Sequence, residues 1–121
     1  MTIESISDMH VHAERRVAIL ALRSELRDSN DEHNMRDLGA RLGYEVDNHV
    51  VVLDPTVEWP LRTIMRALHD KPDAVVIVPD LQHIDGLDAA VRLMAEIVTV
   101  EGERVLKRAQ LDSAATPRGQ R

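Results

Sequence analysis

The fold of this chain is decided by five consecutive apolar residues, Ala74-Val75-Val76-Ile77-Val78. The run follows Lys71-Pro72-Asp73 and stops at Pro79, so it has the length of a strand. Proline cannot donate to an interior ladder, so the strand is expected to end there. An apolar run without alternation is typical of a strand buried on both faces, as in a parallel sheet covered by helices.

Other strand-like segments lie on both sides of this run. Val17-Ala18-Ile19-Leu20-Ala21-Leu22 is a second continuous apolar run. Tyr44-Glu45-Val46 and Val50-Val51-Val52-Leu53 predict one extended segment between the two runs. Val98-Thr99-Val100 predicts a fourth strand, and Glu101-Gly102 turns out of it.

Helical patterns separate these strands. Ser29 with Glu32 three places on predicts a capping box. The helix that follows has Met35, Leu38 and Leu42 on one face. It is expected to end at Gly43, a residue suited to a left-handed conformation. The five glycines all fit caps and turns: Gly39, Gly43, Gly86, Gly102 and Gly119.

Two further helices have the same amphipathic spacing. Pro60 suits the first turn of the second helix, where its missing N–H costs nothing. The stripe of that helix comprises Leu61, Ile64, Met65 and Leu68. Asp85 is expected to cap the third helix, and a short last helix is expected over 104–111. The stripe of the third helix comprises Leu87, Ala90, Val91, Met94 and Ile97.

Strands and helices therefore alternate, which predicts an α/β fold with right-handed crossovers. We expect a small three-layer sandwich with a mainly parallel four-stranded sheet. The domain is expected to span 15–111, after a flexible arm over 1–14 and before a disordered tail over 112–121. A sheet this small with an uncovered edge favours association with another chain.

Composition excludes several classes of protein. The chain has 121 residues, which suits one domain, and no cysteine, which rules out disulfides and thiolate chemistry. No apolar run approaches the roughly 20 residues of a membrane span, and the N-terminus lacks the apolar core of a signal peptide. We expect a cytoplasmic protein that has no contact with a membrane.

The charge balance disfavours nucleic acid as a partner. The formal net charge is −6, whereas phosphate binding needs a basic face. Eight acidic residues outnumber three basic residues over 24–54, while five basic residues outnumber three acidic residues over 101–121. The basic end either touches phosphate or is simply solvated.

Candidate chemistry lies after the strands, because ligands of open parallel sheets bind at the carboxyl ends of the strands. Ser24 there is either a nucleophile or a capping residue, and Arg23 and Arg27 are the nearby cations for an anion. Asp80 is either a base or a cation ligand, or it bonds its own loop. His83 either exchanges protons with Asp80 or is an ordinary loop histidine.

Neither a metal nor a cofactor is expected. His10-x-His12 offers two metal ligands without a third. The loop after the first strand, Arg23-Ser24-Glu25-Leu26-Arg27, contains no glycine and so cannot be a phosphate-binding glycine loop.

Four pieces of the chain share their order and spacing with a known family: 18–24, Arg41-Leu42-Gly43-Tyr44-Glu45-Val46, 59–68 and 73–81. The second piece has a Gly-Tyr pair, the third reads WPLRTIMRAL, and the fourth is a Val-Val strand followed by Pro79-Asp80-Leu81. Together they resemble the N-terminal domain of serine recombinases of the resolvase and invertase group, over about residues 15 to 100.

This resemblance implies a serine that attacks a DNA phosphodiester among several arginines. Ser24 matches that serine, and Asp80 matches an aspartate of the third-strand motif. However, Leu22 stands where the family has an arginine, and Leu81 begins a stretch that replaces further arginines. The negative charge of the phosphorane then lacks its stabiliser. The resemblance therefore implies a catalytically silent relative.

The segment 71–78 also resembles the third strand of response-regulator receivers. Their phosphoacceptor aspartate would fall at Val78, and their paired acids would fall at Leu22 and Arg23. A working phosphoreceiver is not expected.

Three functional hypotheses remain. The first is a non-catalytic protein-interaction module with a resolvase-like fold that forms a homodimer or binds another protein. The second is a DNA-associated accessory or regulatory protein. The third is an enzyme that uses Ser24, Asp80 or His83.

Overall fold

The computed structural model describes residues 15–56 and 58–109, and these residues form a mixed α/β structure around one sheet. The strand order is β2-β1-β3-β4-β5; β1 to β4 are parallel, and β5 is antiparallel to β4. The prediction of a mainly parallel sheet is confirmed, but the sheet has five strands rather than four. The strands are β1 (Val17–Arg23), β2 (Glu45–Leu53), β3 (Val75–Val78), β4 (Glu96–Thr99) and β5 (Val105–Leu106). The expected arm over 1–14 and tail over 112–121 lie outside the described residues.

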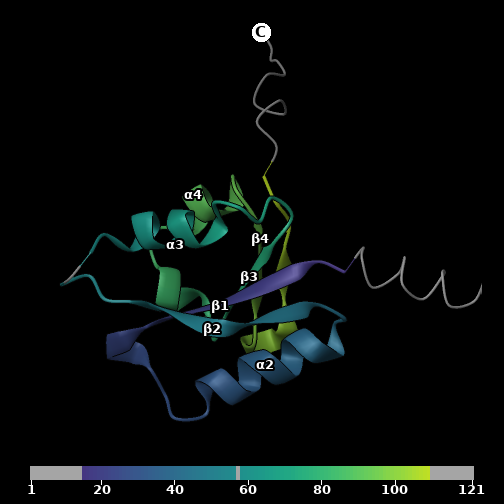
Figure 1. Ribbon diagram of the computed structural model, residues 1–121. Coiled ribbons are helices and arrows are strands. Elements are labelled where there is room, and N and C mark those ends of the chain that lie inside the picture. The colour runs from purple at the N-terminus through teal and green to yellow at the C-terminus, as the bar shows by residue number, and fades with distance from the viewer. Residues whose placement is uncertain (1–14, 57, 110–121) are drawn as a thin grey trace, which may run out of the picture.

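Helices cover both faces of the sheet (Figure 1): α2 lies on one face, and α3 and α4 lie on the other. Because β1 has a helical layer on either side, its side chains enter two cores alternately. Ile19 and Ala21 pack under α3, while Leu20 and Leu22 pack under α2. The helices are α2 (Asp31–Arg41), α3 (Pro60–Leu68) and α4 (Asp88–Arg92), with short 3₁₀ turns η1 (Ser24–Leu26), η2 (Leu81–Ile84) and η3 (Glu101–Glu103).

The start of α2 differs from the predicted capping box. Asp31 accepts a hydrogen bond from the N–H of Asp28 at 2.8 Å, and Asp28 in turn accepts from the N–H of Asn30 at 2.9 Å. The pair is therefore Asp28 with Asp31, one residue earlier than the predicted Ser29 with Glu32. A short carboxylate can bond these turn N–H groups as well as a serine hydroxyl can, so the pattern alone did not fix the register.

Glycines meet two different requirements. Gly43, Gly86 and Gly102 have positive φ, which confirms their predicted places in caps and turns. Gly39 does not, because it lies inside α2 and is buried against the sheet. A Cβ at Gly39 would lie 2.6 Å from Cγ2 of Val46 and 3.1 Å from Cδ1 of Ile77. Close packing of helix on sheet therefore explains this glycine.

Apolar stripes are only partly buried. In α3, Pro60 occupies the first turn and Ile64 is fully buried, as predicted, but Met65 is 50% exposed. In the first helical stripe, Leu42 is 45% exposed because α2 ends at Arg41. Each stripe was predicted one residue too wide, since a short helix that packs on one sheet face buries a narrow strip.

The C-terminal third differs most from the predicted elements. The third helix is shorter than expected, because Asp85 ends η2 and Ile97 lies in β4. No helix forms over 104–109, the described part of the predicted last helix. Instead, η3 turns the chain back, and β5 pairs with β4. Gly102 has a φ of 70°, which gives this turn its left-handed step.

Candidate functional site

Strand β1 ends at the rim where the candidate residues were expected. Ser24 opens η1 directly after Arg23 and is exposed to solvent. His83 lies in η2, after β3, and only 2% of its surface is exposed. The N–H of Arg23 donates to Nδ1 of His83 at 2.9 Å. The structure therefore brings β1 and η2 together through a buried imidazole.

The bond from Arg23 gives one ring nitrogen a partner. Nδ1 is placed to accept a hydrogen bond from the backbone N–H of Arg23. His83 thereby connects two loops at the carboxyl ends of β1 and β3. Within the described residues, no hydrogen bond joins its side chain to the carboxylate of Asp80, so the predicted proton-transfer pair is not assembled in this conformation.

Asp80 bonds its own loop. Its Oδ1 accepts from the N–H of Gln82 at 2.8 Å, which caps η2. The N–H of His83 donates to the carbonyl of Asp80 at 3.2 Å, which closes the same turn. These contacts match the loop-bonding alternative that such an aspartate commonly adopts.

Both candidate arginines have carboxylate partners. Arg23 pairs with Glu25 at 2.7 Å, and Arg27 pairs with Glu32 at 3.8 Å. Nε of Arg23 is buried and finds no acceptor within the described part of the chain. Glu25 and Glu32 therefore offset part of the positive charge that an anion at this rim would need, and Glu32 is shared with Arg36 at 3.0 Å.

Another carboxylate at the same edge is also held locally. Asp54 follows β2, and its Oδ1 accepts from both the hydroxyl (2.6 Å) and the N–H (3.0 Å) of Thr56. The bond from the Thr56 hydroxyl, followed by that from the Thr56 N–H, holds the pKa of Asp54 below its ordinary value. This aspartate stabilises the loop after β2 in its ionised form.

A cavity of about 450 Å³ lies at the opposite edge of the sheet, where β1 and β3 begin. Its lining is of mixed charge and includes Arg16, Lys71 and Asp73. Arg16 donates to the carbonyl of Asp73 at 2.8 Å and forms an ion pair with Glu96 at 3.0 Å, while Lys71 pairs with Asp70. The cations around this cavity therefore stabilise the amino edge of the sheet.

The tryptophan of the chain lies on the surface. Trp59 precedes α3 and is 82% exposed, and Met65 within α3 is 50% exposed. With Leu61 and Arg62 they line a shallow apolar cavity of about 360 Å³. A cluster of exposed apolar side chains such as this one is more typical of an interaction surface than of a solvated helix.

Strand β2 contains a feature that sequence reasoning missed. Ala18 pairs with Val46 and Leu20 pairs with Val50, so β2 has extra residues between these two pairs. We call Asp47, Asn48 and His49 the β2 bulge. The signal was present in the sequence, because a polar Asp-Asn-His insert interrupts an otherwise apolar extended segment.

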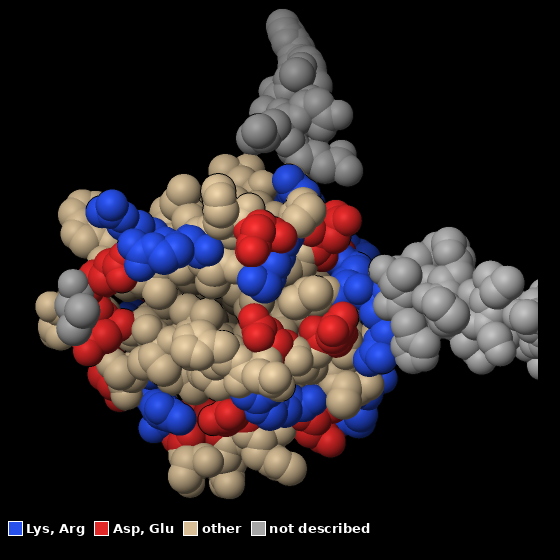
Figure 2. All heavy atoms as spheres, viewed as in Figure 1, with Lys and Arg blue, Asp and Glu red and all other residues tan. Residues whose placement is uncertain are grey.

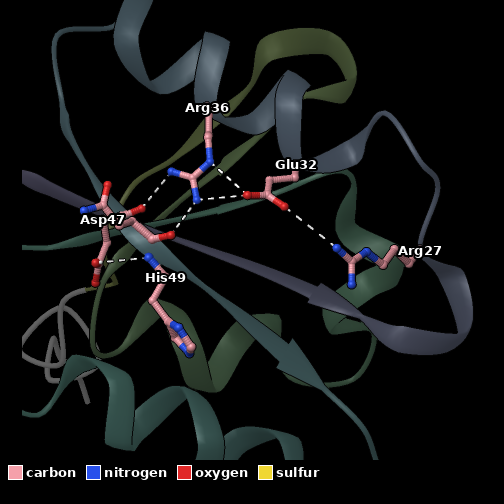
Figure 3. Close-up of polar contacts among 6 residues, drawn as sticks. Arg27, Glu32, Arg36, Asp47 and His49 are labelled. Atoms are coloured by element: carbon pink, nitrogen blue, oxygen red, sulfur yellow. Dashed lines mark hydrogen bonds and ion pairs between the residues drawn. The ribbon is translucent and has the colours of Figure 1, made fainter.

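Arg36 of α2 holds this bulge (Figure 3). Its guanidinium donates to the carbonyl of Asp47 at 3.0 Å and to that of Asn48 at 2.7 Å. Glu32 orients Arg36 from one helical turn earlier, at 3.0 Å, and also faces Arg27. The arginine satisfies carbonyls that the irregular ladder leaves without a regular strand partner.

Over 15–56 and 58–109, no group of three or more histidine, aspartate or glutamate side chains is arranged to hold a metal ion. His10 and His12 lie outside the described residues. None of the helices in the described part of the chain is both long and apolar enough to cross a membrane.

Comparisons with known proteins add no relative. No protein-family model matches this chain, and neither a curated protein nor a solved structure matches it.

Proposed function

We propose that this protein is a non-catalytic protein-interaction module with a resolvase-like fold, and that it associates with itself. One observation carries the proposal: the polar groups at the carboxyl edge of the sheet bond one another and their own loops. Arg23 pairs with Glu25, Asp80 caps η2, and His83 accepts from a backbone N–H. A reactive site would need such groups to face a substrate instead.

The position of Leu22 supports the same proposal. This side chain is fully buried under α2, at the place that holds an arginine in the resolvase and invertase pattern. Ser24 therefore has no cation there to stabilise the charge of an attacked phosphate. The exposed Trp59 supports the interaction function, because burying a tryptophan contributes strongly to protein association.

Two measurements test this proposal. Sedimentation velocity over a range of protein concentrations should show reversible formation of a species heavier than the monomer. A supercoiled plasmid incubated with the protein should stay uncut.

If the plasmid is cut, the matched variants Ser24→Ala and Ser29→Ala show whether Ser24 is responsible. Both serines are exposed, and only Ser24 follows β1. Cleavage that Ser24→Ala abolishes and Ser29→Ala retains would overturn the non-catalytic function. A salt-sensitive band shift with duplex DNA would favour the accessory DNA-binding protein instead. A chain that stays monomeric at all concentrations would refute self-association.

A further inference from the structure

Strand β2 forms one outer edge of the sheet. It has nine residues and, among residues 15–56 and 58–109, pairs on one side only, with β1. In Figure 1 this strand lies in front, with α2 on one face and α3 on the other, so neither helix lies across its outer side. In a parallel ladder, alternate residues direct their N–H and C=O groups away from the neighbouring strand. The outer side of β2 therefore presents backbone groups that a further strand can bond.

The two halves of this edge differ. The first half contains the β2 bulge, which Arg36 ties to α2, and a bulge discourages strand addition. The second half, Val50 to Leu53, is regular and uncharged. Val52 in this half is 40% exposed. Figure 2 shows a broad surface without charged atoms over this part of the molecule.

Starting from the self-association proposed above, we propose that the segment Val50–Val52 pairs antiparallel with the same segment of a second copy. The pair is centred on Val51, so Val50 of one copy faces Val52 of the other. Opposite residues of an antiparallel pair share a face of the sheet, so valine meets valine at each of these positions. No charged residue faces a like charge within this segment, which makes it complementary to itself.

The other edge of the sheet explains why the partner is a second copy in a closed pair. Strand β5 has only two residues, and the chain beyond it is tied back by the N–H of Ala109 donating to the carbonyl of Arg92 at 2.7 Å. A chain with one open edge and one short edge cannot extend its sheet in both directions. Pairing open edge with open edge is isologous and produces a closed two-fold dimer rather than a filament.

The matched variants Val52→Lys and Val105→Lys test this surface. Both valines lie on outer strands with similar exposure, 40% and 43%, but only Val52 lies on the open edge. A lysine is a typical device for blocking strand addition. We expect Val52→Lys to weaken the dimer at least about tenfold by sedimentation, because both copies introduce a charge into the valine seam. Val105→Lys should leave the dimer dissociation constant unchanged.

Cross-linking provides a second measurement, since the chain has no cysteine of its own. In the proposed register the two copies of Val52 are diagonal neighbours, about 7–8 Å apart. A short bismaleimide should therefore join Val52→Cys chains into covalent dimers and should not join Val105→Cys chains. If Val52→Lys fails to fold by circular dichroism, the cross-link decides the question.

The outcomes separate this inference from the proposed function. A wild-type chain that stays monomeric overturns both. A wild-type dimer that tolerates Val52→Lys and gives no Val52→Cys cross-link overturns the β2 edge and leaves self-association standing. A dimer that Val105→Lys disrupts instead would move the interface to β5.

Discussion

Replacing Gly39 by alanine tests the close packing of α2 on the sheet. The new Cβ would lie 2.6 Å from Cγ2 of Val46 and 3.1 Å from Cδ1 of Ile77. The first distance is about 1 Å shorter than an ordinary carbon contact. Overpacking of this kind costs about 1–3 kcal/mol, while alanine inside a helix contributes roughly 1 kcal/mol over glycine. We therefore expect a net loss of about 1 kcal/mol in the free energy of unfolding.

Urea denaturation followed by circular dichroism measures this loss, and thermal unfolding should show a fall in Tm of roughly 4–8 °C. Asn34→Ala is the matched control, because Asn34 is exposed on the same helix. It should stabilise the protein by a few tenths of a kcal/mol, about the difference in helix propensity.

A double-mutant cycle identifies the contact responsible. Val46→Ala removes the Cγ2 atom that the new Cβ would meet, so the double variant should lose about 1 kcal/mol less than the two single losses together. An alanine at position 39 that stabilises the protein as Asn34→Ala does would refute the packing explanation. So would single losses that simply add, since the strain would then not come from Val46.

Three other residues give predictions that separate local roles. His83→Leu removes the acceptor of the Arg23 N–H and should cost about 1–3 kcal/mol of unfolding free energy, whereas His83→Asn retains an acceptor and should cost less; equal losses would contradict the bond. Arg36→Met should speed amide hydrogen exchange in the β2 bulge relative to β3, and unchanged exchange would show that the guanidinium does not hold the bulge. Thr56→Val should raise the pKa of Asp54 toward its ordinary value in an NMR titration. The folded-state pKa of this carboxyl lies below the unfolded value. Its contribution to stability is therefore present above the unfolded pKa and declines as the pH falls through the folded-state pKa. An unchanged pKa of Asp54 in Thr56→Val would contradict the Thr56 contact.

The candidate site could be located from the sequence only in part. The expected α/β order placed Ser24, Asp80 and His83 at one edge of the sheet, because parallel strands end together there. The partners of these groups were not predictable, since the bond from the Arg23 N–H to His83 joins loops 60 residues apart in the chain. The Arg36 contact with the β2 bulge depends in the same way on how α2 lies across β2.

Local sequence determined the elements whose causes lie within the segment itself. The double-faced apolar runs of β1 and β3 predicted buried strands, and Pro60 predicted where α3 begins, because burial on both sides and a missing N–H act within the segment itself. Tertiary structure decided the rest. Residues 104–109 hold a short strand rather than the predicted helix because β4 offers a ladder beside them, and such a ladder is absent from any local window. Gly39 is required because a distant strand lies against it, so only the folded chain gives the physical reason for its missing side chain.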